Sequence, residues 1–426
     1  MLRFDAENRV IKKEEYRAIL VGVQTGEDIS YSMEELAGLA EAAGVRILGE
    51  LIQNLEKIHP RTYVGKGKLQ ELAELCHTME ADLVIANDEL TGIQLRNMEE
   101  IASVSVIDRT LLILDIFAAR ATSREGKLQV ETAQLQYRLP RLTGLGKSLS
   151  RLGGGIGTRG PGEKKLETDR RHIQKRIDEI RRETEEHQGH RKIQRAQSER
   201  SDLPVVALVG YTNSGKSSIM NRMLAMENRP DKQVLEKDML FATLDASRRL
   251  ITTEDRHRFL LIDTVGFVSK LPHTLVKAFR STLEEVVEAD LLLHVVDANF
   301  PEADFHIEVT DKVLRELGAG DKPKLLLFNK IDLMPGYSLP AYGKNALAIS
   351  TKTGQGYDEL LARIKELLFV DSTEVDVLIP YSRGDLVSYL CKQTHPRILT
   401  HREEGTFLTV ALDRADRKRF EAFIVS

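Results

Sequence analysis

The sequence predicts an α/β protein in four parts: an N-terminal α/β domain, a helical hairpin, a second α/β domain and a small α+β C-terminal domain. In two regions, short apolar runs alternate with amphipathic stretches, which is typical of mostly parallel sheets covered by helices. Between these regions, apolar residues recur at helical spacing on both sides of a glycine-rich tract. We place the parts at residues 1–122, 123–200, 201–370 and 371–426.

Composition narrows the classes of protein that the chain can represent. Its 426 residues carry a net charge of −4, so any nucleic-acid contact must come from a local basic patch. Cys76 and Cys391 lie far apart, which disfavours a disulfide framework or a zinc site and fits a reducing cytosol. There is no signal-type apolar segment, and no run reaches the ~20 residues of a membrane span. We expect a cytoplasmic, monomeric protein without a membrane span.

In the first part, the apolar patterns predict three strands and three helices. The strands are expected at 18–24, 82–88 and 103–109, and the helices at 33–44, 69–80 and 95–104. Their alternation predicts a mostly parallel sheet. No catalytic motif is visible in this part.

The second part contains two sets of four apolar residues with the same spacing of 7, 4 and 3. They are Leu128, Leu135, Leu139 and Leu142, and then Leu166, Ile173, Ile177 and Ile180. Each set forms one stripe on a helix, so the two helices are expected to pair as an antiparallel hairpin. Pro140 is expected to end or kink the first helix near Leu139. The tract SRLGGGIGTRGPGE, at 150–163, then lies at the hairpin tip, and 187–202 is expected to be a linker.

The third part contains four apolar runs that each end in a polar motif, at 203–210, 259–266, 291–297 and 324–330. Ligands of open α/β sheets bind at the carboxyl ends of the strands, so a binding site is expected there. The fourth part is expected to contain a strand at 375–380, a helix at 385–393 and two further strands, RILTHRE and FLTVALD.

The motif GYTNSGKS, which begins at Gly210, fits the phosphate-binding pattern G-x-x-x-x-G-K-[ST] between a strand and a helix. Its two glycines let backbone N–H groups point at phosphate oxygens, Lys216 can reach the β- and γ-phosphates, and Ser217 can ligate Mg²⁺. The predicted nucleotide contacts here are Gly210, Tyr211, Thr212, Asn213, Ser214, Gly215, Lys216, Ser217 and Ser218. The similar GLGKS at 144–148 fails the pattern because Arg141 stands where its first glycine should be.

Two further motifs follow apolar strands in the same part. In DTVG (263–266), Asp263 can hold Mg²⁺ through a water molecule, and the Gly266 N–H can sense a γ-phosphate. In NKID (329–332), Asp332 can accept from the N–H pair of guanine, Asn329 can support the base and Lys330 can cover its plane.

A fourth motif, STKTGQG, contributes Ser350, Thr351 and Lys352, near which backbone N–H groups could meet the guanine carbonyl oxygen. The order of the four motifs resembles that of the translation-factor-like GTPases and implies a P-loop GTPase domain. Switch I should then lie between the first two motifs. Thr243 is the best candidate there to complete the Mg²⁺ shell, with Thr252 and Thr253 as rivals. We expect Lys216, Thr243 and Gly266 to act in catalysis.

The hairpin and the tract GGIGTRGPGE precede the four nucleotide-binding motifs. With them, nearly the whole chain resembles the HflX family of ribosome-associated GTPases. The segments that carry the likeness include LFATLD, DTVGF and NKID. Thr351 departs from the usual motif, in which alanine stands at this position. The resemblance implies binding to the large ribosomal subunit and its RNA, and the splitting of stalled or idle ribosomes under stress. It also implies that the hairpin tip reaches toward the peptidyl-transferase region.

Two hypotheses concern GTP hydrolysis. Phe267 stands where many GTPases carry a glutamine that orients water, so we expect slow intrinsic hydrolysis that a partner accelerates; the resemblance implies the ribosome. Asn213 is a candidate ligand for K⁺ beside the phosphates, with a simple turn residue as the equal alternative.

From 141 to 165, six basic residues and one acidic residue give a local charge of +5. This charge could neutralise RNA phosphates, or it could belong to a solvated tip. The predicted RNA contacts are Arg151, Gly153, Gly154, Gly155, Arg159, Gly160, Lys164 and Lys165. A second reading is a GTP-latched RNA-binding or large-subunit assembly factor without a splitting role. A third, an RNA-remodelling ATPase, is disfavoured because 1–200 contains no other phosphate loop.

Overall fold

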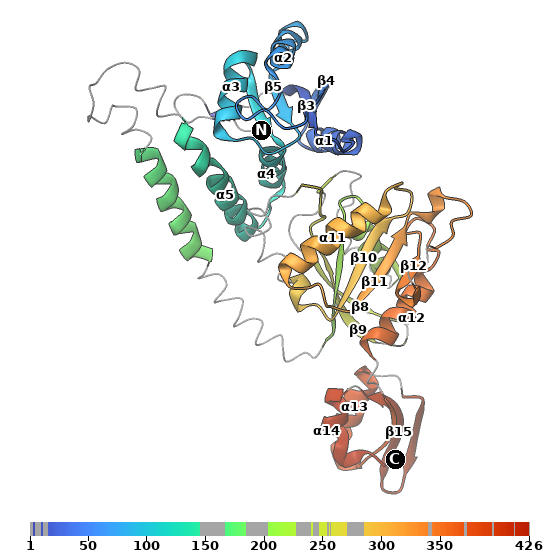
Figure 1. Cartoon of the computed structure of the whole chain (residues 1–426). Coiled ribbons are helices and arrows are strands. Elements are labelled where there is room, and N and C mark those ends of the chain that lie inside the picture. Colours follow the sequence, from blue (N-terminus) through green and yellow to red (C-terminus); the bar gives the residue numbers. More distant parts are fainter. Residues whose placement is uncertain are drawn as a thin grey trace. The chain divides into compact units, whose positions relative to one another are not determined.

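The computed structural model forms two compact units (Figure 1). The first contains residues 1–194 with two later segments, 237–245 and 267–282, and the second contains the rest of the chain. The structure describes residues 3–4, 10–11, 16–144, 167–184, 203–226, 240–241, 247–253, 255, 257–270, 285–339, 343–369, 373–393, 396–412 and 414–425. The four-part division expected from the sequence stays a prediction.

The main sheet of the first unit is parallel, with strand order β4-β3-β5-β6. Its strands are β3 (Tyr16–Gln24), β4 (Val45–Asn54), β5 (Leu83–Ala86) and β6 (Ser105–Asp108), and its helices are α1 (Ser30–Ala42), α2 (Lys66–Thr78), α3 (Gly92–Ala102) and α4 (Arg109–Arg120). α1 packs with α4, and α2 packs with α3. From β3 the chain adds β4 on one side, and then adds β5 and β6 on the other side. The switch point therefore lies between the carboxyl ends of β3 and β5. A separate pair joins β1 (Arg3–Phe4) to β2 (Val10–Ile11).

The predicted parallel sheet of the first part is confirmed, but β4 and α4 were not expected. β4 alternates buried with exposed residues irregularly, and charged side chains interrupt its apolar pattern. α4 has no single apolar stripe, because seven of its residues are buried on several sides. The Asp108 carboxylate begins α4 by accepting a hydrogen bond from the Leu111 N–H at 2.9 Å.

The hairpin consists of α5 (Arg124–Arg138) and a second helix at 167–184. Arg124 pairs with Glu183, and Arg176 pairs with Glu131 at 2.7 Å, so residue numbers rise on one helix as they fall on the other. The expected antiparallel pairing is therefore confirmed. A 3₁₀ turn, η1 (Leu139–Gly144), follows α5 and includes Pro140, which ends the helix as predicted.

The apolar stripe of α5 differs from the predicted one. Ile177 and Ile180 of the second helix are buried as expected, and so is Leu128. Leu135, Leu139 and Leu142 are only half-buried, whereas Val130, Ala133 and Tyr137 are buried. The reason is that α5 packs against α4 as well as against its hairpin partner, so its apolar surface is broader than one stripe. Leu166 lies outside the described residues.

The second unit contains a six-stranded sheet with the order β12-β11-β10-β7-β9-β8. Its strands are β7 (Val205–Gly210), β8 (Ser247–Thr252), β9 (Arg258–Asp263), β10 (Leu291–Asp297), β11 (Lys324–Asn329) and β12 (Ala346–Ala348), and its helices are α8 (Lys216–Met226), α11 (Ala303–Leu317) and α12 (Tyr357–Leu368). β8 is antiparallel to β9, and the other pairs are parallel. Residues such as Leu208, Ile219 and Phe259 form its core. The switch point lies between β7 and β10.

The C-terminal part contains an antiparallel sheet with the order β13-β15-β14, as expected for an α+β domain. Its elements are β13 (Thr373–Ile379), α13 (Gly384–Gln393), β14 (Ile398–Arg402), β15 (Gly405–Leu412) and α14 (Arg414–Phe420). Val377, Leu390, Leu408 and Phe420 lie in its core. The short helix α14 was not expected, because its sequence RADRKRF is largely charged.

Candidate nucleotide-binding site

The polar motifs of the third part gather at the carboxyl edge of the six-stranded sheet. β7 ends at Gly210, β9 at Asp263, β10 at Asp297 and β11 at Asn329. All four strands are parallel, so the loops that follow them meet at one edge, around the switch point between β7 and β10. Predicted nucleotide contacts from three separate motifs therefore lie together.

Both glycines of the phosphate loop are required by the local geometry. Gly210 has φ of 143°, and a Cβ placed on it would lie 2.2 Å from the Val295 carbonyl oxygen. Gly215 has φ of 96°, and its Cβ would lie 2.2 Å from Asn329 Nδ2. A side chain at either position would push the loop away from the strands that support it.

Lys216 folds back over the phosphate loop. Its Nζ donates to the Gly210 carbonyl oxygen at 3.2 Å and to the Tyr211 carbonyl oxygen at 2.6 Å. Burial lowers the pKa of Lys216 to about 8, and the nearby Asp263 carboxylate partly opposes this shift. Phosphate groups brought to this ammonium would give it direct charge partners, so the loop is suited to a polyphosphate.

Ser217 and Asp263 form the pair that would hold a metal ion. The Ser217 hydroxyl donates to Asp263 Oδ2 at 2.7 Å, and Asp263 is fully buried. Hydroxyl and carboxylate oxygens are the hard ligands that Mg²⁺ prefers, so this donor set fits the ion. A Cβ on Gly266 would lie 2.7 Å from Thr212 Cα and 2.9 Å from Lys216 Nζ, so the DTVG motif contacts the phosphate loop directly.

Asn329 connects the phosphate loop to the fourth motif. Its side-chain amide donates to the Ser214 carbonyl oxygen at 3.0 Å. Its Oδ1 accepts from the Thr351 backbone N–H at 3.1 Å and from the Thr351 hydroxyl at 2.8 Å. The hydroxyl of Thr351 thus makes a bond that the usual alanine could not make. Asn329 acts as a brace between the loops expected to hold the two ends of a nucleotide.

The residues expected at the base are held by their own partners. The Ser350 hydroxyl donates to Asp332 Oδ1 at 2.6 Å, which orients this carboxylate. Lys330 has a left-handed backbone with φ of 67°, and its Nζ donates to Asp297 Oδ2 at 2.7 Å. Lys352 is exposed. Asp332 and Lys330 are thus each held by a neighbouring side chain.

One supporting contact was missed by reasoning from the sequence. The His306 ring, on α11, lies between the rings of Tyr211 and Phe300, at centroid distances of 3.7 and 4.1 Å. Burial lowers the pKa of His306 to about 4, so the ring is neutral at pH 7. The stack fixes Tyr211 of the phosphate loop. Tyr211 and His306 lie far apart in the sequence and share no motif, so no local signal could have shown the contact.

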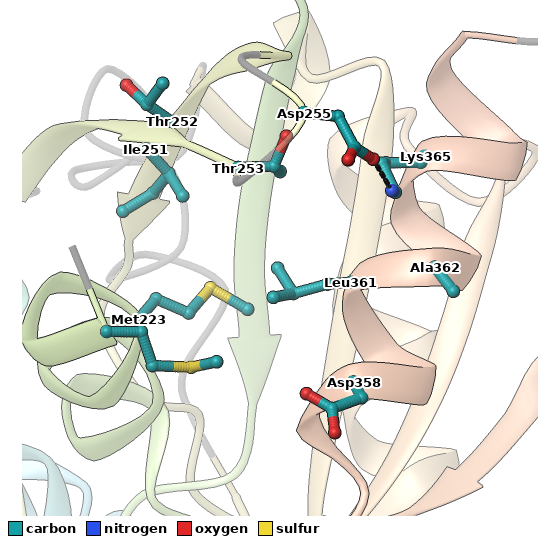
Figure 2. Close-up of a pocket in the computed structure, with 10 residues that line it drawn as sticks. Met223, Ile251, Thr252, Thr253, Asp255, Asp358, Leu361, Ala362 and Lys365 are labelled. Atoms are coloured by element: carbon teal, nitrogen blue, oxygen red, sulfur yellow. Dashed lines mark hydrogen bonds and ion pairs between the residues drawn. The ribbon is translucent and has the colours of Figure 1, made fainter.

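The two rivals for the switch I threonine lie at the wrong end of the sheet. Thr252 pairs with Arg258, at the start of β9, whereas Asp263 ends the same strand. At ~3.3 Å per residue, this places Thr252 about 16 Å along the strand from Asp263, too far to share a metal ion. Thr253 follows it and, with Thr252, lines a hollow of about 260 Å³ beside α8 and α12 (Figure 2). Thr243 lies outside the described residues.

Arg141 does not belong with the basic residues that were counted in the hairpin tip. It donates to Glu89 at 2.9 Å and to the Leu90 carbonyl oxygen at 2.8 Å, and it lies 3.4 Å from the buried Asp108. Its guanidinium also stacks on the Tyr137 ring. Counting it with the tip was wrong, because net charge does not show which side chains are paired. The local charge of the tip becomes +4.

The predicted RNA contacts, Arg151, Gly153, Gly154, Gly155, Arg159, Gly160, Lys164 and Lys165, all lie outside the described residues. The charges of the second helix, by contrast, are described. Arg171 pairs with Glu167 at 3.3 Å and Lys175 with Glu179 at 3.8 Å. These pairs fit the expected ordinary exposed helix face.

Three family profiles match the chain in succession. They are described as "GTP-binding GTPase N-terminal" (residues 30–118), "GTP-binding GTPase Middle Region" (120–198) and "50S ribosome-binding GTPase" (205–330). The GTPase HflX of Caldanaerobacter subterraneus is 45% identical over 98% of this chain and 95% of its own length. The chain belongs to the HflX family of GTPases.

A second HflX relative agrees with this assignment. The GTPase HflX of Escherichia coli is 40% identical over 87% of both chains. A solved GTP-binding protein from Sulfolobus solfataricus, in complex with GDP, is 25% identical, covers 83% of this chain and 98% of its own, and has a TM-score of 0.44.

As a member of the HflX family, the chain is a GTP-binding protein that hydrolyses GTP, and its P-loop GTPase domain is of a kind that generally uses Mg²⁺. The bound ion would neutralise charge on the phosphates. None of the helices among the described residues is both long and apolar enough to cross a membrane.

Proposed function

We propose that this GTPase binds the large ribosomal subunit in its GTP-bound form and splits stalled or idle ribosomes under stress. The observation that carries the proposal is the hairpin, whose helices pair in antiparallel and whose tip carries a charge of +4 in a chain of −4. The match of 205–330 to a region described as "50S ribosome-binding GTPase" supports it. In this proposal the protein works in the cytoplasm as a monomer.

The tip is proposed to contact ribosomal RNA through its arginines and lysines. Each phosphate contact that is lost should reduce the slope of log affinity against log salt by roughly 0.7–0.9. Changing Arg151, Arg159 and Lys164 to glutamine should therefore weaken subunit binding and flatten this slope. The matched control changes Arg171 and Lys175 to glutamine, because these exposed residues are already paired with glutamates. If the two variants show the same slope of log affinity against log salt, the tip does not contact RNA phosphates.

For splitting itself, the sharper test is removal of residues 151–160. The deletion should leave GTP binding unchanged, because the nucleotide motifs lie on other loops. It should abolish the conversion of whole ribosomes to subunits in a gradient. Splitting that survives the deletion would assign the task to another surface.

The residues of the site support a mechanism in which the protein binds and orients GTP and a partner completes catalysis. Lys216 would contact the β- and γ-phosphates, Ser217 and Asp263 would hold Mg²⁺, and the Gly266 N–H would contact the γ-phosphate. Phe267 is buried, and its ring offers no group that could hold the attacking water. The expected result is slow hydrolysis alone and faster hydrolysis with large subunits. A fast rate that subunits leave unchanged would contradict the proposal.

Asn213 is a proposed K⁺ ligand at the phosphates. A monovalent cation there would offset the charge that develops on the leaving phosphate oxygens. Hydrolysis should then be faster in K⁺ than in Na⁺, and Asn213→Ala should remove the difference. Equal rates of the wild-type protein in both salts would leave Asn213 as a turn residue, consistent with its φ of 60°.

The alternative is a GTP-latched RNA-binding or large-subunit assembly factor without a splitting role. It would also bind the large subunit and use the same nucleotide site. Mixing the protein and GTP with intact ribosomes distinguishes the two, since only the splitting factor should lower the fraction of whole ribosomes.

A further inference from the structure

A hollow of about 260 Å³ lies between α8, β8 and α12 in the second unit (Figure 2). Thr252 and Thr253 line it, and we call it the α8–α12 hollow. Thr252 lies about 16 Å along the sheet from Asp263, so the hollow is separate from the nucleotide site. An apolar cavity of about 150 Å³ holds benzene, so the hollow has room for a ligand with two fused rings.

The floor of the α8–α12 hollow is apolar and belongs to the core of the sheet. Met223 and Ile251 are each 2% exposed, and Leu361 packs against the same core cluster. Figure 2 shows Met223 and Leu361 pointing toward each other across the hollow, from α8 and α12. A methionine side chain is flexible, and its sulfur makes favourable contacts with aromatic rings. The floor is therefore suited to an aromatic ligand.

Charged groups lie at the two ends of the α8–α12 hollow. At one end, Asp255 and Lys365 form an ion pair between the turn after β8 and α12. At the other end lies Asp358, which has no ion-pair partner among the residues that the structure describes. The lining thus contains two carboxylates and one ammonium group, which is already paired. This negative balance would repel an anionic ligand, whereas a ligand ammonium group could pair with Asp358.

Both helices that line the hollow begin at loops of the nucleotide site. α8 starts with Lys216 of the phosphate loop, and α12 starts at Tyr357, directly after the STKTGQG motif. Arg222 of α8 donates to the Thr353 carbonyl oxygen of that motif at 3.3 Å, and a Cβ on Gly354 would lie 2.1 Å from its Nη2. α8 therefore packs closely against the loop before α12. The spacing of the two helices is thus linked to the positions of two nucleotide-binding loops.

We propose that the α8–α12 hollow is a second ligand site, which binds an arylalkylamine with its rings on the apolar floor and its ammonium group at Asp358. Such a ligand contacts both helices and holds them at the spacing at which Lys216 and Thr351 lie together at the nucleotide site. Its binding should therefore raise the affinity for GDP, and GDP should raise the affinity for the amine by the same factor. This role goes beyond ribosome binding and does not depend on it.

Equilibrium dialysis of the full chain against 2-naphthylmethylamine, a cation at pH 7, tests the site. The neutral 2-naphthalenemethanol and the anionic 2-naphthoate share its rings, and the chain contains no tryptophan to obscure naphthalene fluorescence. The amine should bind with a Kd on the order of 1 mM or lower. It should bind about two- to fivefold more tightly than the alcohol, as expected for an exposed ion pair, and the carboxylate should bind most weakly. No binding of the amine, or equal binding of all three compounds, would overturn the proposal.

Two matched variants test the role of Asp358. Asp358→Asn removes the carboxylate and should bring the affinities for the amine and the alcohol together. The control is Glu359→Gln, because Glu359 is the next residue in the first turn of α12, carries the same charge and does not line the hollow. It should keep the preference for the amine. If Asp358→Asn keeps the preference as well, the ammonium group does not bind at Asp358 and the proposed ligand class is wrong.

Filling the hollow tests the location of the bound amine. Leu361→Trp places a larger side chain on the floor and should lower the affinity for the amine at least about fivefold, while circular dichroism shows that the variant folds. If it does not fold, Ala362→Trp takes its place, because Ala362 lines the hollow at an exposed position. Unchanged binding in a folded variant would place the amine elsewhere and overturn the site.

Calorimetric titration with GDP, with and without saturating amine, tests the link to the nucleotide site. In the wild-type protein, the amine should raise the affinity for GDP about fivefold or more. In the folded variant with the filled hollow, the amine should leave the affinity for GDP unchanged. An unchanged GDP affinity in the wild-type protein would overturn the link between the two sites.

Discussion

Substitution of Gly215 by alanine should disconnect the phosphate loop from the guanine side of the site. Gly215 has φ of 96°, and the added Cβ would lie 2.2 Å from Asn329 Nδ2, a separation that real side chains do not tolerate. Asn329 would have to move, and with it the brace to Ser214 and Thr351. A nucleotide bound by the predicted residues would span these loops, so we expect the cost to appear in nucleotide affinity.

The size of the effect follows from the contacts that are lost. A left-handed backbone costs a residue with a Cβ about 1–2 kcal/mol. Moving Asn329 breaks three hydrogen bonds, each worth about 1 kcal/mol. The backbone cost falls on stability, whereas the three lost bonds, about 3 kcal/mol together, correspond to a loss of affinity on the order of a hundredfold.

Equilibrium titration with a fluorescent GDP analogue measures this loss. The matched control is Gly336→Ala, because Gly336 has φ of 82° but no atom within 4 Å of an added Cβ. The control should show the backbone cost in stability alone and bind GDP normally. A GDP affinity of Gly215→Ala within threefold of that control would show that the Asn329 hydrogen bonds are not needed for nucleotide binding.

Three further predictions concern single residues. Burial holds the pKa of Lys216 at about 8, and bound phosphate should raise it. GDP binding at pH 8 should therefore take up about half a proton. Calorimetry in buffers of different ionisation enthalpy measures this uptake. Affinity should fall as pH rises above 8, and Lys216→Ala should abolish tight binding while the fold stays intact; no proton uptake would contradict the buried lysine. Arg141→Met should destabilise the first unit by roughly 3 kcal/mol, because it leaves the buried Asp108 without its cation, yet leave ribosome affinity unchanged. A loss of ribosome affinity without a loss of stability would show that Arg141 acts with the tip residues in binding the ribosome. His306→Ala should weaken GDP binding about three- to tenfold by freeing Tyr211, and unchanged affinity would show that the stack is not needed.

The parts of the fold that the sequence predicted are those with local signals. Strands that end in GYTNSGKS, DTVG and NKID stand out because a buried run and a ligand-binding turn adjoin each other. Pro140 ends α5 for a local reason too, since it cannot donate a helix hydrogen bond. By contrast, β4 and α4 lack a clean period, because one alternates irregularly and the other is buried on several sides.

The parts that the sequence could not predict depend on distant partners. Arg141 is a basic residue beside a basic loop, and only the fold shows that Glu89 and Asp108 pair with it. The contact of Ser269 with Glu35 spans more than two hundred residues and has no motif. Thr252 could be set aside as a metal ligand only from the register of β8 on β9.

Gradient sedimentation of ribosomes with the protein and nucleotide tests the proposed function most directly. With a non-hydrolysable GTP analogue, the account predicts that the protein travels with large subunits while the peak of whole ribosomes shrinks. With GDP, most of the protein should stay at the top of the gradient. A protein that stays at the top with both nucleotides, and leaves whole ribosomes intact, would contradict the account.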